Sequence, residues 1–287
     1  DRMKVRAGST AGRATVSQVA DGPSGFANCL KFDCTTADAS IAAGEYFFLT
    51  NIFEGQDLQQ LKKGTSDAES VTLSFYVKGN ASATYTLEMK DQDNSRINTQ
   101  TFAVTTSWNK ISLTFIPDTT GAYDDDNLAS LQVNWHLHAG STYTGGTFAS
   151  NTWASEVQAN RVSSSATSFL DSTNRTFFIT GIQMEVGTVA TPFEHRSYGQ
   201  ELALCQRYYQ LSENAHAIGL SSSTIFIAQP LAVQMRAAPT IGQTGVFNCQ
   251  NGSNINTSQS STGLGSSYST TREIYLHGVP NFSGLTA

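Results

Sequence analysis

The sequence predicts an all-β protein: a two-sheet antiparallel jelly-roll sandwich, followed by a short helix and a small C-terminal β domain. Charged residues make up only 14% of the chain, which is rich in Ser, Thr, Asn and Gly. This composition is typical of strands and tight turns, whereas helices favour Glu, Lys, Leu and Ala. The 287 residues are enough to bury a core without disulfides or metals.

Alternation of apolar and polar residues is the second observation that favours strands. Every second residue is apolar in the segments 71–77, 85–89, 111–115 and 131–137, and the run 176–186 also has strand character. Half-buried antiparallel strands need a second sheet to cover their apolar faces. Eight or more strands over about 190 residues therefore fit a two-sheet jelly roll.

Three regions follow from these patterns. We expect a jelly roll over residues 1–195, a helical connector over 196–210 and a small C-terminal β domain over 211–287. The convincing helix is Gln200–Gln210, with Leu202, Cys205 and Tyr209 along one side. So short a helix is marginal in isolation and has to pack on something.

Several functions are disfavoured. The net charge is −6 and no basic run is present, so we expect no nucleic-acid partner. No apolar stretch approaches the roughly 18 residues of a membrane span, so we expect no membrane insertion. No GxSxG, HExxH or P-loop pattern occurs, nor the regular repeat of a long parallel β-helix. We therefore expect that the chain is not an enzyme.

Four runs carry a family resemblance. They are Gly181–Tyr209 (GIQMEVGTVATPFEHRSYGQELALCQRYY), Phe53–Leu61 (FEGQDLQQL) followed by Leu73–Gly79 (LSFYVKG), Pro117–Asn127 (PDTTGAYDDDN) and Val233–Thr240 (VQMRAAPT). They resemble the tail-fibre and related virion proteins of tailed phages, of a type frequent in marine phages. The matches spread from about residue 45 to residue 240.

The resemblance implies a carbohydrate-binding-module-like jelly roll in a virion protein, displayed on a tail fibre or another surface appendage and usually homotrimeric. The small C-terminal β domain would then serve as a tip or for trimerisation. Its partners would be other virion proteins and a host cell-surface glycan, bound during adsorption. One alternative is a purely structural virion protein, a head decoration or tail scaffold with no ligand. A polysaccharide depolymerase is the third reading, which requires a pair of carboxylates flanking the scissile bond.

The loop 140–154 is the candidate carbohydrate-binding site. Trp153, Tyr143, Phe148 and Asn151 lie there among Gly, Ser and Thr. Sugar rings present C–H groups that stack on aromatic side chains, and amides bind their hydroxyls. The alternative is a loop tucked against the sandwich or a neighbouring subunit. Trp108 and Trp135 are interpreted instead as core or core-edge residues.

Metal binding has one candidate site, in the acidic loop 118–127. Asp118, Asp124 and Asp126 could supply carboxylate oxygens to a structural calcium, the one possible cofactor. The alternative is a solvated loop. His136 and His138 share a strand face, where HxH pairs can bind metal, but we favour two solvated side chains.

The cysteines predict no zinc site. Cys29, Cys34, Cys205 and Cys249 contain no CxxC pair. Because a phage protein folds in a reducing cytoplasm, we expect free, buried thiols and not disulfides.

Overall fold

The computed structural model describes residues 3–211, 217–221, 224–240, 247–251, 254–259, 265–266 and 273–277, with side chains for 3–211 and 230–240. The chain divides into two compact units, Arg2–His195 and the C-terminal unit beginning at Arg196.

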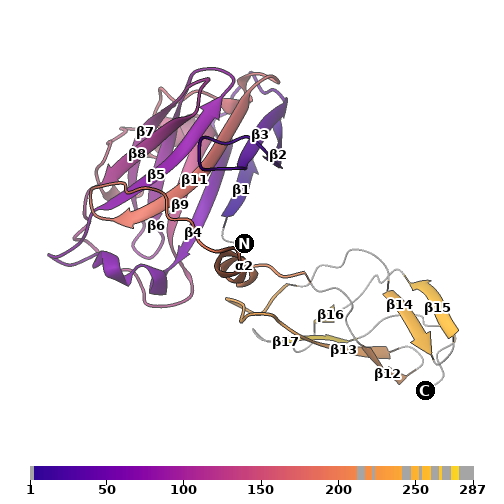
Figure 1. The fold of residues 1–287 in the computed structure, drawn as a ribbon. Coiled ribbons are helices and arrows are strands. Elements are labelled where there is room, and N and C mark those ends of the chain that lie inside the picture. The colour runs from indigo at the N-terminus through magenta and orange to yellow at the C-terminus, as the bar shows by residue number, and fades with distance from the viewer. Residues whose placement is uncertain are drawn as a thin grey trace. The chain divides into compact units, whose positions relative to one another are not determined.

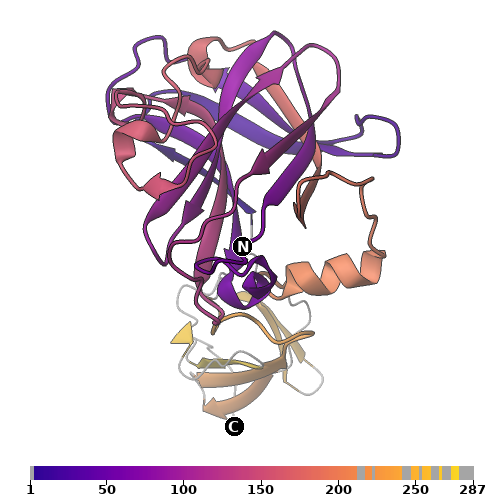
Figure 2. The same ribbon diagram turned by 90° about the vertical axis from the view of Figure 1, so that its left-hand side faces the viewer.

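The first unit is a sandwich of two antiparallel sheets. The first sheet has the order β1 (Met3–Gly8), β4 (Tyr46–Glu54), β9 (Ala129–Ala139), β6 (Ala83–Asp91), β7 (Arg96–Val104), β10 (Ala154–Ser155). The second sheet has the order β2 (Arg13–Val19), β3 (Cys29–Thr36), β11 (Thr176–Val186), β5 (Val71–Gly79), β8 (Asn109–Phe115). Figures 1 and 2 show the two sheets face to face. The predicted two-sheet antiparallel fold is confirmed.

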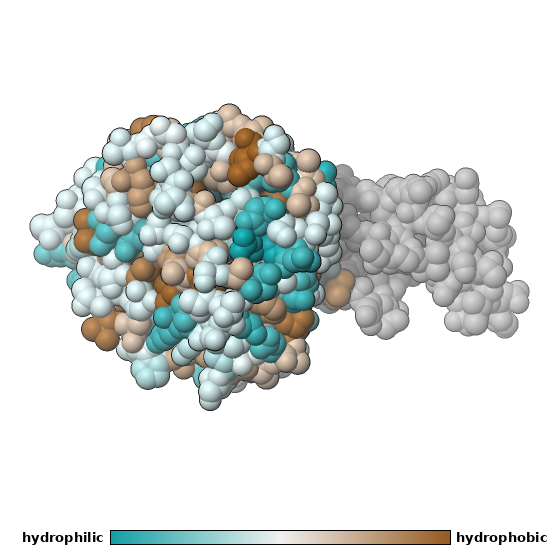
Figure 3. Space-filling model, turned by 90° about the horizontal axis from the view of Figure 1, so that it is seen from above, coloured by the Kyte–Doolittle hydropathy of each residue, from teal (hydrophilic) through white to brown (hydrophobic). Residues whose placement is uncertain are grey.

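The core between the sheets includes most of the apolar residues that the alternation selected, together with others from β3, β4, β7 and the connections. Trp135 of β9 and Phe75 of β5 are fully buried, with ring centroids 5.8 Å apart in an edge-to-face contact. Phe102 of β7 meets Phe75 in the same way at 5.3 Å. Edge-to-face pairs suit the ring quadrupoles and add to the hydrophobic term. On the face shown in Figure 3, by contrast, apolar residues lie in small groups separated by hydrophilic ones.

Short helical turns lie in the connections of this unit. Two follow β4, η1 (Gly55–Asp57) and η2 (Gln59–Leu61). Three others belong to the long connection from β9 to β11: α1 (Ser141–Thr144), η3 (Gln158–Asn160) and η4 (Phe169–Asp171). The connection contains the predicted ligand loop, and its residues 140–168 are called the covering segment below.

The C-terminal unit begins with a helix and continues as strands. Helix α2 (Tyr198–Gln206), seen along its length in Figure 2, opens with a capping box between Ser197 and Gln200. It ends four residues before the predicted Gln210, because Tyr208 already bonds three residues back, to the Cys205 carbonyl. None of the described helices has the length and apolar character needed to cross a membrane.

The strands of this unit form two small sheets. One has the order β12 (Ala217–Ser221), β13 (Thr224–Pro230), β17 (Glu273–His277), β16 (Gly265–Ser266). The other pairs β14 (Phe247–Asn251) with β15 (Asn254–Gln259). The predicted small C-terminal β region is therefore present.

Two cysteines follow the expectation of free, buried thiols. Cys29 and Cys34 of β3 are both buried and unpaired, and their burial raises the pKa of each thiol. Cys205, in contrast, is free but exposed on α2. The side chain of Cys249 lies outside the described residues.

Replacing the central core tryptophan tests this packing. Trp135→Ala should lower the free energy of unfolding by about 3–5 kcal/mol, because it leaves a large cavity between the sheets. Val16→Ala is the matched control: Val16 is 41% exposed, so its truncation should change stability by about 0.5 kcal/mol or less. Urea unfolding monitored by circular dichroism measures both, and a similar loss in the two variants would contradict this core.

Candidate functional site

Trp153 and Asn151 of the predicted sugar-binding loop lie at the end of β8. The indole Nε1–H of Trp153 donates to the Ile116 carbonyl at 2.8 Å, and its half-buried ring packs against the core. Asn151 Oδ1 accepts from the Ile116 N–H at 3.1 Å. Both side chains use their polar atoms to hold the loop to the sandwich, as the alternative reading of the loop expected.

Tyr143 lies in a different environment. Its ring meets Tyr46 of β4 edge-to-face at 5.8 Å, and the Arg161 guanidinium lies 5.9 Å from its centroid. Phe148 is half-buried. The structure therefore pairs Trp153 with Asn151 but places Tyr143 against other partners, so the four predicted residues do not form one aromatic surface.

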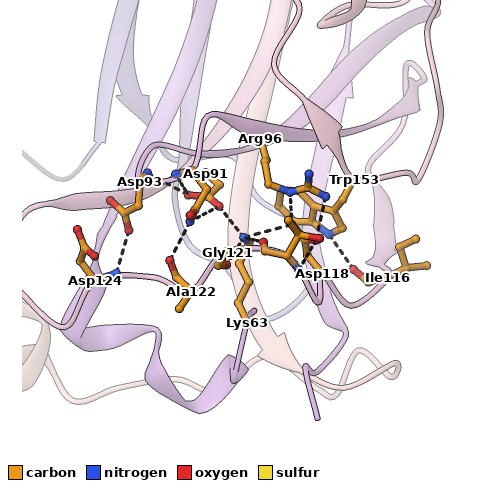
Figure 4. Close-up of polar contacts among 12 residues, drawn as sticks. Lys63, Asp91, Asp93, Arg96, Ile116, Asp118, Gly121, Ala122, Asp124 and Trp153 are labelled. Carbon is orange, nitrogen blue, oxygen red and sulfur yellow. Dashed lines mark hydrogen bonds and ion pairs between the residues drawn. The ribbon is translucent and has the colours of Figure 1, made fainter. Parts of the chain in front are cut away.

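Asp118, the first predicted calcium ligand, is neutralised by cations of the chain itself (Figure 4). Arg96 holds both of its carboxylate oxygens, at 2.7 and 2.9 Å. The buried ammonium of Lys63 lies 3.2 Å from Asp118 and 2.6 Å from Asp91, and donates to the carbonyls of Thr120 and Gly121. Burial alone would raise the pKa of Asp118, but these hydrogen bonds and charges outweigh it and lower the pKa.

The other two predicted ligands do not join Asp118. The backbone N–H of Asp124 donates to Asp93, and Asp126 Oδ1 accepts from the Leu128 N–H within the loop. Figure 4 shows Asp124 apart from Asp118. Among the described residues, no three His, Cys, Asp or Glu side chains are grouped to hold a metal. The three predicted ligands are therefore not grouped, and the positive charge beside Asp118 comes from Lys63 and Arg96.

A buried ionic cluster lies on the polar face of the first sheet. Glu88 of β6 is fully buried and receives two hydrogen bonds from Arg161, at 2.7 and 2.8 Å. Asn134 and His136 of β9 donate to the same carboxylate, at 2.8 and 2.9 Å. Arg161 belongs to the covering segment, so its ion pair fastens that segment onto the sheet.

The histidine prediction is wrong on one point. His136 and His138 do share the polar face of β9, but they are 2% exposed and not solvated. His138 lies between Glu45 and Ser168, which close over it at 3.1 and 2.8 Å. The backbone N–H of Ser163 also bonds to Thr86 Oγ1. The covering segment therefore shields this sheet face from water.

The protonation states of the cluster follow from burial and charge. Burial opposes ionisation of Glu88, but Arg161 outweighs it and holds the pKa of Glu88 well below its usual range. Burial lowers the pKa of His136, so its imidazole is neutral at pH 7 and Nε2–H is the donor to Glu88. Glu88 is therefore a fixed anion and Arg161 a fixed cation, and together they form a structural ion pair.

The outer face of the second sheet carries aromatic side chains that the sequence analysis did not select. Five half-buried rings lie there, here called the aromatic face: Phe26, Tyr76, Trp108, Phe178 and Phe193. Phe26, from the β2–β3 connection, meets Tyr76 at 5.3 Å and Phe193 at 5.0 Å. Residues 187–195 after β11 return across the same sheet, where Gly187 accepts from Thr72 and Thr191 accepts from Lys110.

A lysine sits between two of these rings. The Lys78 ammonium lies 4.7 Å from the Phe178 centroid and 5.1 Å from that of Trp108. Asp21 pairs with Lys78 at 2.6 Å and accepts from the Trp108 indole N–H at 3.2 Å. Cation–π contacts and the ion pair thus hold both rings in place at the surface.

A glycine makes the other half of the aromatic face possible. Gly181 lies at an irregularity of β11 and has φ +60°, a conformation that L-residues rarely adopt. A Cβ atom at this position would lie 2.7 Å from the Phe26 ring and 3.1 Å from Tyr76. Glycine is therefore required for Phe26 to lie against this strand.

Part of this face had a signal in the sequence. The alternation places Tyr76 on the polar side of its strand, opposite the core residue Phe75, and Phe178 beside the buried Phe177 in the same way. An aromatic residue on the polar side of a strand is therefore the sequence signal for a ring on the outer face of a sheet. Phe26 and Phe193 lie in connections, where no periodicity indicates orientation.

Removing Arg161 tests the ionic cluster. Arg161→Met should lower the free energy of unfolding by about 3–5 kcal/mol at pH 7, because Glu88 is left buried without a counter-ion. In the wild type the folded pKa of Glu88 is lowered, so its contribution is complete above the usual carboxyl range and is lost as pH falls below it. In the variant, burial would raise the pKa of Glu88, so this carboxyl group would become protonated and neutral as the pH falls from 7 to 5. The loss of unfolding free energy relative to the wild type should therefore be smaller at pH 5 than at pH 7.

Urea unfolding at the two pH values measures this deficit. The control is Glu88→Gln combined with Arg161→Met, which removes both charges and should recover much of the loss. A deficit that is equal at both pH values, or a double variant no more stable than Arg161→Met, would contradict the ionic account.

Comparisons with known proteins locate similar folds at low identity. No family model and no curated protein matches the chain, so the resemblance to phage tail-fibre proteins stays a prediction. A solved family 4 carbohydrate-binding module has a TM-score of 0.37 at 11% identity, covering 64% of this chain and 86% of its own. A family 11 carbohydrate-binding module from Clostridium thermocellum, in complex with a β-1,3-1,4-mixed-linked tetrasaccharide, has a TM-score of 0.34 at 12% identity. This match covers 66% of this chain and 91% of the module. The enzymatically active domain of tailspike protein 4 of bacteriophage CBA120 has a TM-score of 0.34 at 12% identity, covering 64% of this chain and 19% of its own. At such identities and TM-scores, nothing about binding or activity transfers from these proteins to this chain.

Proposed function

We propose that this chain is a non-catalytic, glycan-binding part of a bacteriophage virion appendage, a tail fibre that attaches to a host surface glycan. The observation that carries the binding role is the aromatic face. Five rings lie half-exposed on one sheet, and two of them are fixed by Lys78 and Asp21. Rings held in place before binding lose little conformational freedom on contact with a ligand.

The chemistry of this face suits a sugar ring. The C–H groups of a pyranose stack on aromatic side chains, while charged and hydroxyl groups nearby bind its hydroxyls. Lys31 and Thr180 border Phe178 and Tyr76 on adjacent strands, and Lys31 also pairs with Asp33. All three polar side chains are partly accessible. Aromatic rings with such a border can orient a hydroxyl-rich ligand.

The carboxyl groups with shifted pKa values lack one property of a glycosidase acid. Hydrolysis of a glycosidic bond needs a carboxylic acid whose pKa is raised so that it can donate a proton. Among the described residues, the carboxyl groups whose pKa clearly departs from the usual value all have it lowered: Asp21, Asp38, Glu88, Asp118 and Glu185. Such groups are anions that hydrogen bonds and neighbouring charges stabilise.

The place on a virion rests on the four sequence runs that resemble phage tail-fibre proteins. In this proposal the chain forms a homotrimer and attaches to other virion proteins. Three weak sites on one fibre, and several fibres on one particle, would raise avidity without any tight single contact.

A purely structural virion role is the second candidate. The observation that favours it is the loop 140–154, where Trp153 Nε1–H and Asn151 Oδ1 are hydrogen-bonded to the Ile116 backbone. A spacer or decoration protein would need no more from this loop.

Binding by the aromatic face is tested with Trp108→Ala. Binding of the purified chain to a glycan array and to intact bacterial cells should weaken at least tenfold, because the variant loses a stacking surface worth roughly 1.4 kcal/mol. Trp153→Ala is the comparison, since it removes a tryptophan from the loop and not from the aromatic face. Circular dichroism and thermal melting confirm that each variant is folded.

The pattern of losses separates the readings. If Trp108→Ala loses binding and Trp153→Ala keeps it, the aromatic face is supported as the binding site. Loss only in a folded Trp153→Ala would move the site to the loop 140–154. Absence of saturable binding by the wild-type chain in its native oligomeric state would favour the structural role.

A further inference from the structure

β1 and β2 form an edge of the sandwich that the first unit leaves uncovered. Each strand ends its sheet and pairs with one neighbour, β1 with β4 and β2 with β3 (Figure 1). Edge strands of a sandwich commonly bury every second side chain. Here Lys4–Ala7 and Thr15–Gln18 are exposed without alternation. Exposed strand edges of this length invite pairing with another chain.

This edge is also basic. Residues 2–20 contain four Lys or Arg and no Asp or Glu, within a chain of net charge −6. Lys4, Arg6 and Arg13 are exposed, and none of them forms an ion pair with a described residue. Exposed Val5 and Val16 lie among them. The edge thus offers unneutralised positive charge together with apolar surface.

The part of the acidic loop that directly precedes β9, residues 124–128, has the opposite character. Residues 111–160 contain five carboxylates and no Lys or Arg. Asp118 and Glu156 are paired internally, with Arg96 and Lys90 among their partners. Asp124, Asp125 and Asp126 form no ion pair with any residue whose side chain is described, and Leu128 beside them is 58% exposed.

We propose that the basic edge of one copy of this chain binds the acidic loop 124–128 of a second copy. The two surfaces match in charge, and each carries exposed aliphatic side chains that an association would bury. The C-terminal unit offers no comparable acidic partner, since its only carboxylate side chains are Glu201, Glu213 and Glu273, far apart in sequence. Because the two surfaces differ, the contact is heterologous and repeats from copy to copy until a ring closes.

Charge reversal on each surface tests the pairing in the full chain. Lys4→Glu with Arg6→Glu makes the edge acidic, and Asp124→Lys with Asp125→Lys makes the loop basic. Sedimentation velocity over a concentration series should show self-association of the wild type that weakens from about 0.05 to 0.5 M NaCl. Each double variant should associate at least tenfold more weakly. Their equimolar mixture, and the chain with all four changes, should associate again.

Asp67→Lys with Glu194→Lys is the matched control, because both carboxylates are exposed and lie outside the two surfaces. It should associate as the wild type does, and circular dichroism checks the fold of every variant. A wild type that stays monomeric at every concentration would overturn the proposal. So would association that survives both reversals, or reversals that weaken association without recovery in the mixture. These measurements need no glycan, so their failure leaves the proposed glycan binding by the aromatic face untouched and bears only on how copies of the chain associate.

Discussion

The ion pair between Arg161 and Glu88 decides which faces of this sandwich can meet a ligand. Two sheets that share a core leave two outer faces, and either could be a binding surface. Arg161 draws the covering segment onto the polar face of the first sheet, where Glu88, His136 and Asn134 then lie out of water. With that face closed, the outer face of the second sheet remains, and the aromatic side chains lie there.

The attachment of the covering segment depends on both Arg161 and Glu88. A carboxylate moved out of water costs several kcal/mol, and the bidentate arginine with two further donors offsets that cost. The same donors keep Glu88 ionised, so it lacks the raised pKa of a general acid. One arrangement therefore accounts for the stability of the covering segment and for the unsuitability of its most buried carboxylate as a proton donor.

The sequence could predict what repeats along one strand, but not what meets from distant parts of the chain. Alternation identified the core side of β5 and β9, because burial on one face imposes a period of two. It also placed His136 on the polar side. It could not show that this side is covered, since the contact with Arg161 involves no periodicity. For the same reason it missed Phe26 and Phe193, which lie in connections and meet only in the folded unit.

The sequence did not show that the predicted calcium ligands lie apart, for a related reason. A run of carboxylates indicates negative charge, but it does not show which cation neutralises it. In the fold Lys63, from a different connection, places its ammonium among oxygens of Asp91, Asp118, Thr120 and Gly121. Trp153 and Tyr123 lie beside that ammonium, within 5.6 and 5.2 Å. The tryptophan predicted to bind sugar thus helps to enclose an internal charge.

Two sets of charges in this unit differ in their partners. Inside, Glu88, Asp91 and Asp118 each have a cation of the same chain within hydrogen-bonding distance. Outside, the basic edge and the acidic loop 124–128 are left without such partners among the described residues. Under the proposed function, an aromatic face that binds one glycan weakly would gain avidity from several copies presented together. Complementary exposed charges are a simple means of bringing copies of one chain into that arrangement, because each copy carries both surfaces.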